Sequence, residues 1–201
     1  MIIKVCIPYY AEYEACKAGL KELQESETHT FILSPVKGSV VAFTRNYLVN
    51  EGVSTKRSQR LVQACDGYLF IDSDIEFTLE DVLALIEAKK PITALPYETY
   101  SNSGVYQVGE WEHVAGNIKS KYPTDTEGWK KVAWIGGGMH LVMKHVYEAM
   151  EYPWYRHSLV ELGDNQEQTS EDLGFCIEAK KAGFNIWCNF DMPVIHTKEG
   201  T

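Results

Sequence analysis

Short apolar runs alternate with amphipathic stretches in the first half of the chain. A nearly unbroken apolar run ending at Pro8 is typical of a strand covered on both faces. The pattern predicts strands at Ile2 to Ile7, Thr30 to Leu33 (closed by Ser34-Pro35), Gly67 to Ile71 and Ile92 to Leu95. It predicts helices at Ala11 to Gln24, Val41 to Val49, and from the Thr78 cap, with Asp81 three residues later, to Pro91. This order implies a doubly wound sheet with helices on both faces, whose ligands bind at the carboxyl ends of the strands.

The pattern of apolar and polar positions is different in the second half, because residues 97 to 131 are polar and rich in aromatic side chains. We expect loops and antiparallel strands there. Further strands are predicted at Lys131 to Ile135, Asn185 to Cys188 and Pro193 to His196, and helices at Lys144 to Met150 and Ser170 to Lys181, the latter ended by Gly183. The prediction is one α/β domain over 1–201 whose two parts, 1–97 and 98–201, differ in pattern.

Composition narrows the choice of partners. The 201 residues are 45% hydrophobic, enough for one core, and the formal net charge of −9 argues against nucleic acid as a partner. A small anion bridged by a cation remains compatible with this charge. Five cysteines without a CxxC pair indicate reduced thiols and a cytoplasmic location, and no apolar run reaches the roughly 20 residues of a transmembrane segment.

The segment Asp72-Ser73-Asp74 follows the apolar run Gly67 to Ile71. Two carboxylates one residue apart at the end of a buried strand favour a divalent cation such as Mg²⁺ or Mn²⁺. The alternative is a solvated turn, where acidic residues are common. Glu76 is a further candidate ligand, although we expect it to point to solvent.

Several motifs, in order, resemble those of nucleotide-sugar glycosyltransferases of the GT-A fold. Pro8-Tyr9-Tyr10 resembles the first strand and loop, which cradle the base and ribose, and Asp72-Ser73-Asp74 matches the DxD motif. Ser170-Glu171-Asp172 resembles the ED motif at a helix start, and His196 resembles the late metal-binding histidine. The resemblance covers essentially the whole chain, and it implies a Rossmann-like mixed sheet. It also implies a nucleotide-binding half (1–97) and an acceptor-side half (98–201).

The resemblance implies a role for each of these positions. Asp74 would bind the metal directly, while Asp72 would hold the ribose or reach the metal through water, beside Ser73 on the donor side. His196 would add a nitrogen ligand, which favours Mn²⁺ over Mg²⁺. The metal would then neutralise the leaving nucleoside diphosphate. Taken alone, a histidine near a strand end is a structural or exposed residue as often as it is a metal ligand.

Asp172 is the general base that the resemblance implies, and Glu171 would orient the site or bind an acceptor hydroxyl. The alternative is that both acids only complement the helix dipole, with Ser170 as the cap.

Three further groups are candidates for substrate contacts. Gly136-Gly137-Gly138 is either a flexible turn or, as the resemblance implies, a backbone that approaches the sugar closely, with Trp134 and His140 as wall residues. Arg45 is either part of an exposed helix face or a contact for the diphosphate. The aromatic stretch 152–157, with Trp154 and Tyr155, is a candidate lining of the acceptor side, and residues 163–167 are a candidate lid.

Two other functions compete with this interpretation. A haloacid dehalogenase-type phosphohydrolase also has a strand ending in DxD, but it needs Thr or Val where Glu76 stands. A non-catalytic nucleotide-sugar or glycan-binding module would keep the metal and transfer nothing. We predict an inverting, Mn²⁺- or Mg²⁺-dependent glycosyltransferase that moves a sugar from a UDP-sugar to a glycan hydroxyl. Its brevity resembles small bacterial or virus-encoded members, the latter acting in the host cytoplasm.

Overall fold

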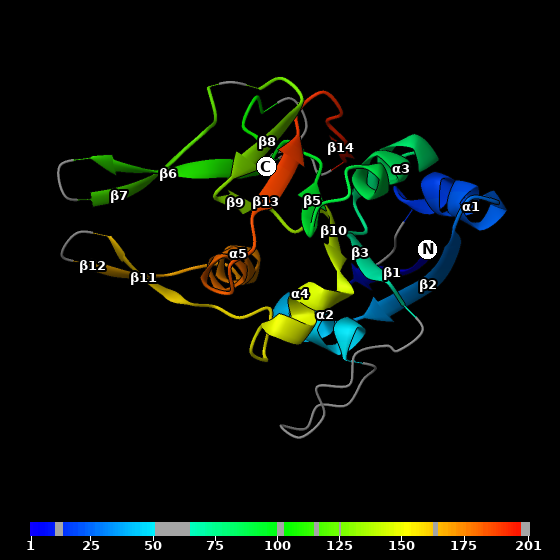
Figure 1. Ribbon diagram of the computed structural model, residues 1–201, viewed down its shortest axis with the longest axis horizontal. Helices are drawn as coiled ribbons and strands as arrows, with labels where there is room; N and C mark the ends of the chain where they lie inside the picture. Colours follow the sequence, from blue (N-terminus) through cyan, green and yellow to red (C-terminus); the bar gives the residue numbers. More distant parts are fainter. Residues whose placement is uncertain are drawn as a thin grey trace.

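The computed structural model describes residues 1–10, 14–50, 65–99, 103–114, 117–124, 126–162 and 165–197. A seven-stranded mixed sheet forms its centre (Figure 1). Its strands, in spatial order, are β2 (Thr30–Lys37), β1 (Ile2–Tyr9), β3 (Gly67–Ile71), β10 (Met139–Met143), β5 (Ile92–Ala94), β13 (Ile186–Asn189) and β8 (Trp129–Val132). β10 and β8 run antiparallel to their neighbours, and the remaining pairs are parallel.

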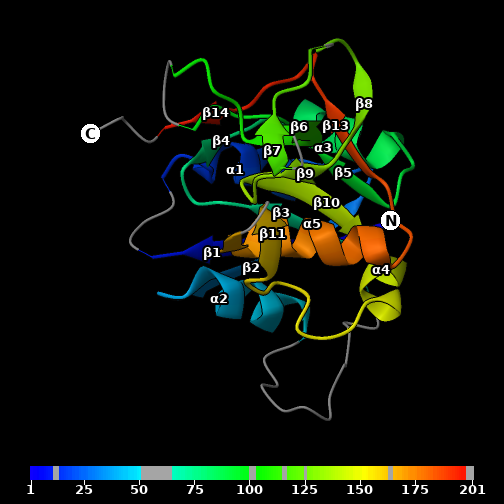
Figure 2. The same ribbon diagram turned by 90° about the vertical axis from the view of Figure 1, so that its left-hand side faces the viewer.

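Helices cover both faces of this sheet (Figure 2). One face carries α1 (Lys17–Glu25) and α3 (Leu79–Glu87), and the other carries α2 (Val41–Val49), α4 (Lys144–Ala149) and α5 (Glu171–Lys181). Successive residues of β3 alternate between the layers, because strand side chains point to opposite faces. Leu69 and Ile71 pack with α1 and α3, whereas Tyr68 and Phe70 pack with α2, α4 and α5. Both faces of β3 are therefore buried, as its unbroken apolar sequence predicts.

Three smaller antiparallel sheets are built mainly from the second half. They are β7 (Asn117–Lys121) with β6 (Val108–Val114) and β9 (Trp134–Ile135); β11 (Leu159–Leu162) with β12 (Asn165–Gln168); and β4 (Ile75–Glu76) with β14 (Ile195–His196). Antiparallel pairing was the expectation for residues 97 to 131, and β6 and β7 confirm it.

Local signals place several elements correctly. The bounds of α2 and β3 are the predicted ones. Thr78 and Asp81 form a reciprocal capping box at the start of α3. Gly183 follows α5 with a φ of 90°, and its N–H donates to the carbonyl of Lys180. This is the left-handed conformation in which glycine commonly ends a helix.

Other elements differ from the prediction. β2 continues through Ser34-Pro35 to Lys37, because it is an edge strand in which the missing N–H of proline faces no neighbour. The predicted strand over 131–135 divides into β8 and β9, which join different sheets. The sequence analysis missed β10, which separates β3 from β5 at the centre of the sheet. α1 starts at Lys17, and part of its predicted beginning, residues 11–13, lies outside the described residues.

Candidate active site

The predicted site residues gather where β1 and β3 end. These parallel strands finish at the same edge of the sheet, so the Tyr9 end of β1 and the acidic turn after β3 are neighbours. The N–H of Asp72 donates to the carbonyl of Gly138 at 2.8 Å, which joins the acidic turn to the glycine segment before β10. This one edge therefore brings two distant motifs together.

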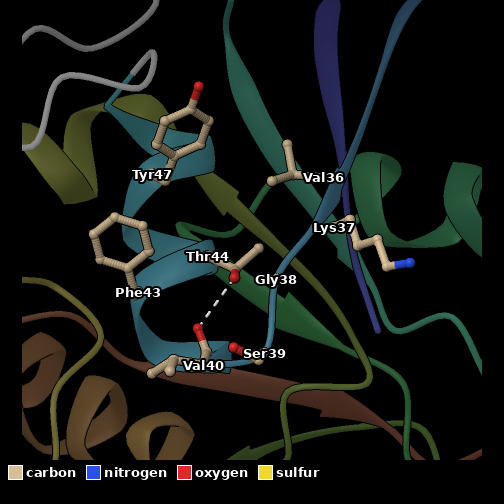
Figure 3. A pocket seen from close by; sticks show the side chains of 8 residues that line it. All are labelled: Val36, Lys37, Gly38, Ser39, Val40, Phe43, Thr44 and Tyr47. Atoms are coloured by element: carbon tan, nitrogen blue, oxygen red, sulfur yellow. Dashed lines mark hydrogen bonds between the residues drawn. The ribbon is translucent and has the colours of Figure 1, made fainter. Parts of the chain in front are cut away.

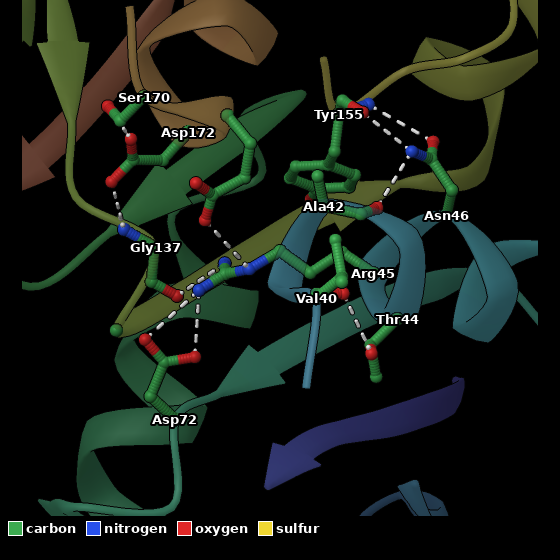
Figure 4. Close-up of polar contacts among 12 residues, drawn as sticks. Val40, Ala42, Thr44, Arg45, Asn46, Asp72, Gly137, Tyr155, Ser170 and Asp172 are labelled. Atoms are coloured by element: carbon green, nitrogen blue, oxygen red, sulfur yellow. Dashed lines mark hydrogen bonds and ion pairs between the residues drawn. The ribbon is translucent and has the colours of Figure 1, made fainter. Parts of the chain in front are cut away.

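Asp72 is held by an arginine from α2. Both of its carboxylate oxygens accept hydrogen bonds from Arg45 Nη2, at 2.8 and 3.0 Å (Figure 4). Arg45 Nη1 donates to the Gly137 carbonyl at 2.8 Å, and Nε lies 3.7 Å from Glu171 Oε1. Burial alone would lower the pKa of Arg45, but Asp72 and Glu171 outweigh it and the pKa is raised, so the guanidinium stays charged. Burial raises the pKa of Asp72 to about 6, and Arg45 opposes that rise.

Asp74 meets a different partner, His196, although 122 residues separate them. The reason is the pairing of β4 with β14, which sets His196 opposite Ile75. The N–H of Thr197 also donates to the Asp74 carbonyl at 2.9 Å. As a result, His196 Nε2 lies 3.1 Å from Asp74 Oδ2.

The hydrogen bonds of His196 leave room for either a cation or a second proton at its contact with Asp74. His196 Nδ1 lies 2.9 Å from the Glu98 carbonyl, which can only accept, so Nδ1 carries a proton. In the neutral ring, the lone pair of Nε2 then faces the carboxylate of Asp74. Two lone pairs repel each other, so a metal ion or a second proton must lie between them. A metal-ligating histidine commonly donates its other N–H to a backbone carbonyl, as His196 does.

Two protein ligands fit the predicted metal, and the third expected one is turned away. Asp74 is 43% exposed at its side chain, whereas the oxygens of Asp72 face Arg45. In the described part of the chain, no three His, Cys, Asp or Glu side chains gather closely enough to hold a metal ion. At such a site, water or a bound ligand would supply further coordination.

Asp172 lies in the first turn of α5 and is tied to the glycine segment. Its Oδ2 accepts from the Gly137 N–H at 3.1 Å, and its Oδ1 accepts from the Leu173 N–H at 2.8 Å. Ser170 was expected to cap the helix with its side chain, but its hydroxyl instead donates to Asp172 Oδ1. The serine therefore orients the candidate base rather than the helix terminus.

The three glycines are packed rather than flexible. None has a positive φ. A Cβ on Gly137 would lie 2.2 Å from the Arg45 guanidinium nitrogens, and a Cβ on Gly136 or Gly138 would lie 2.3 or 2.6 Å from Tyr97. Tyr97 also accepts from the Gly138 N–H at 3.1 Å and contacts the His196 ring edge-on. The sequence analysis assigned Tyr97 no role, although its position just beyond the predicted strand Ile92 to Leu95 placed it at the functional edge.

The acceptor-side prediction requires a correction. His140, Trp154 and Tyr155 are buried, with at most 1% of each exposed, so they cannot contact a sugar in this structure. Burial lowers the pKa of His140 well below its usual range, so the ring is neutral. Its Nδ1 therefore donates to the Gly137 carbonyl at 3.2 Å, while Nε2 accepts from the Tyr155 hydroxyl at 2.9 Å. These residues support the glycine segment from the core.

The remaining candidates lie nearer the surface. Tyr10 is 72% exposed and Tyr9 is half-buried, while Pro8 is buried in β1. Ser73 and Trp134 are half-buried. Of the predicted lid, Asn165 to Glu167 belong to β12, paired with β11, and residues 163–164 lie outside the described residues.

A pocket of about 640 Å³ lies between the end of β2 and the outer face of α2 (Figure 3). Its lining consists of Val36, Lys37, Gly38, Ser39, Val40, Phe43, Thr44 and Tyr47. None of the predicted site residues contributes to it. Among the described helices, none is long and apolar enough to cross a membrane.

Comparison with known proteins identifies the fold. No family model matches the sequence, and no curated protein matches it either. The structure is similar to A197 from STIV, over 100% of this chain and 96% of that one, with a TM-score of 0.56 and 14% identity. The structure is also similar to the catalytic domain of Drosophila β1,4-galactosyltransferase 7, solved with xylobiose. The match covers 97% of this chain and 70% of that chain, with a TM-score of 0.54 and 11% identity.

GalNAc-T7, solved with UDP, GalNAc and Mn²⁺, is similar over 98% of this chain, with a TM-score of 0.54 and 13% identity. The match spans 37% of that longer chain. At these identities the likeness establishes the fold alone. The chain has the mixed α/β fold of GT-A glycosyltransferases, as its sequence predicts.

Proposed function

We propose that the chain is a metal-dependent, inverting glycosyltransferase that moves a sugar from a nucleoside diphosphate, with UDP as the expected nucleotide, to a carbohydrate hydroxyl. The observation that carries the proposal is the contact of Asp74 with His196 at the carboxyl edge of the sheet. A metal ion can bridge these two groups, as a second proton also could, and this is the edge where doubly wound sheets bind ligands. The fold, shared with glycosyltransferases, supports the same conclusion.

Asp74 and His196 would hold the cation, and the imidazole ligand favours Mn²⁺ over Mg²⁺. When bound, the ion supplies positive charge that stabilises the departing diphosphate. Pro8, Tyr9 and Tyr10 would line the nucleoside site, with Ser73 beside them. The 72% exposure of Tyr10 leaves its ring available for stacking on a base.

Asp172 would act as the general base. The acceptor oxygen forms a bond to the anomeric carbon as the bond from that carbon to the diphosphate oxygen breaks, and the acceptor proton passes to Asp172. The Gly137 N–H, the Leu173 N–H and the Ser170 hydroxyl fix the orientation of the carboxylate, while the remaining lone pair on Oδ2 can accept a proton. Attack opposite the leaving group inverts the anomeric centre.

The first experiment is to find the donor by thermal shift with UDP-, GDP- and dTDP-sugars in the presence of Mn²⁺, since ligands that bind the native state raise its Tm. Transfer to a panel of oligosaccharides is then measured for the wild type, Asp172→Asn and the control Glu87→Gln, an exposed residue at the end of α3. We expect Asp172→Asn to lower kcat about 100-fold or more, because a positioned base typically contributes that much. UDP affinity should stay within about twofold, and Glu87→Gln should behave as wild type.

Undiminished transfer by Asp172→Asn would exclude it as the base. Mn²⁺-dependent UDP binding without any transfer by the wild type would indicate the non-catalytic binding module. Hydrolysis of phosphomonoesters in the absence of an acceptor would indicate the phosphohydrolase.

A further inference from the structure

Arg45 is enclosed by protein and cannot reach a ligand in this structure. Its side chain is 2% exposed and lies 5.8 Å from the ring centroids of both Phe70 and Tyr155. Its nitrogens face three segments that are distant in sequence: Asp72 after β3, Gly137 before β10 and Glu171 at the start of α5. The original expectation that Arg45 contacts the diphosphate therefore does not fit its position.

The Gly137 peptide connects Arg45 to the candidate base. Its carbonyl accepts from Arg45 Nη1 and His140 Nδ1, and its N–H donates to Asp172 Oδ2. Both the carbonyl and the N–H of Gly137 are thus hydrogen-bonded. Because a Cβ here would lie 2.2 Å from the guanidinium nitrogens, the glycine backbone is packed directly against Arg45. A displacement of the guanidinium must therefore displace the peptide, and with it the hydrogen bond to Asp172.

We propose that Arg45 is a positioning residue that couples the donor-side carboxylate Asp72 to the base Asp172 through the Gly137 peptide. This inference rests on the proposed function. Removal of Arg45 takes away no group that touches a substrate, yet it releases both carboxylates from their fixed separation. A shift of about 1 Å at a reacting group can cost about 100-fold in rate, so the effect should appear in kcat rather than in the KM of the donor.

Comparison of a double variant with a single variant separates positioning from simple charge balance. Arg45→Met alone leaves Asp72 without its arginine and risks unfolding, so the informative comparison is R45M/D72N, which lacks both members of the pair, against D72N, which keeps the buried guanidinium. We expect the Tm of R45M/D72N to be no lower than that of D72N, because the double variant buries no unpaired guanidinium, but kcat to fall at least a further tenfold. The matched control Thr44→Val changes a buried polar residue of α2 outside the network and should leave kcat unchanged. Equal kcat in R45M/D72N and D72N would overturn the proposal.

The Gly137 amide supplies a second readout that needs no donor. In ¹⁵N–¹H spectra of the metal-free protein, its resonance and its hydrogen exchange report the bond to Asp172 even if the chain transfers no sugar. We expect the resonance to shift and exchange to accelerate at least tenfold in R45M/D72N relative to D72N, and to stay unchanged in T44V. An unmoved Gly137 amide would refute the coupling, whereas failure of the proposed function would show only as absent transfer by the wild type.

Discussion

Asp72 and Asp74 are one residue apart in the same motif, yet their surroundings differ sharply. Asp72 has 28% of its side chain exposed, and both oxygens accept from a guanidinium that is 2% exposed. Asp74 has 43% of its side chain exposed, and its Oδ2 lies 3.1 Å from His196 Nε2. The first is built into the framework of the site, and the second is open to a ligand.

This difference assigns separate tasks to the two acids of a DxD pattern. A carboxylate neutralised by a buried arginine is a poor additional metal ligand, but it anchors everything that the arginine holds. A partly exposed carboxylate that contacts a histidine on the two-residue strand β14 contributes little to the fold and can accept a cation. The comparison therefore predicts that changes at the two positions affect different measurements.

The largest expected effect is on stability. Asp72→Ala leaves the Arg45 charge buried without its main partner and should lower the free energy of unfolding by about 3 kcal/mol, the scale of a broken buried ion pair. Asp74→Ala should cost less than about 1 kcal/mol, as for an exposed pair. Urea unfolding followed by circular dichroism measures both. Equal losses in the two variants would remove the distinction drawn between them.

The next effect is on metal binding, for which Asp74 rather than Asp72 should be the sensitive position. Asp74→Ala and His196→Ala should each weaken Mn²⁺ binding at least tenfold, because each removes a ligand of the proposed metal site. Asp72→Asn and the exposed neighbour Glu76→Gln should stay within about threefold of wild type. Titration of free Mn²⁺ by electron paramagnetic resonance gives the affinities. Loss of binding in Asp72→Asn, with the fold intact, would restore Asp72 to the set of ligands.

The smallest effect is on thiol reactivity. All five cysteines are buried thiols, and burial raises the pKa of Cys176 to about 12 and that of Cys16 to about 11. At pH 8 little thiolate exists, and modification must follow local opening of the structure. Cys176 lies in the layer of α2 and α5, together with Arg45, so Asp72→Ala should speed its modification several-fold more than Asp74→Ala does. Mass spectrometry of labelled peptides would show this, and equal rates would count against a local role for Asp72.

Sequence patterns predicted the elements whose signals are local. The apolar run of β3, the Thr78 capping box and Gly183 each depend on a few neighbouring residues. The sequence analysis did not predict β10, because a five-residue apolar strand that runs directly into a helix has no periodicity of its own. The sequence therefore suggested a parallel neighbour for β3, where an antiparallel strand from the second half inserts.

In the candidate site, too, the contacts that depend on long-range packing could not be predicted from local sequence patterns. Proximity of Asp74 to His196 followed from the resemblance, and strand pairing provides the physical reason for it. The burial of His140, Trp154 and Tyr155 could not be inferred, because aromatic density is compatible with either a core or a sugar site. The pairing of Arg45 with Asp72 depends on how α2 packs on the sheet, which no local pattern records.

Calorimetric titration of UDP into the protein, with Mn²⁺ or with EDTA, tests the central claim most directly. The account predicts binding that requires Mn²⁺, that is lost in Asp74→Ala, and that is kept within about threefold in Glu76→Gln. UDP binding of equal affinity with and without the metal, or undiminished binding by Asp74→Ala, would contradict it.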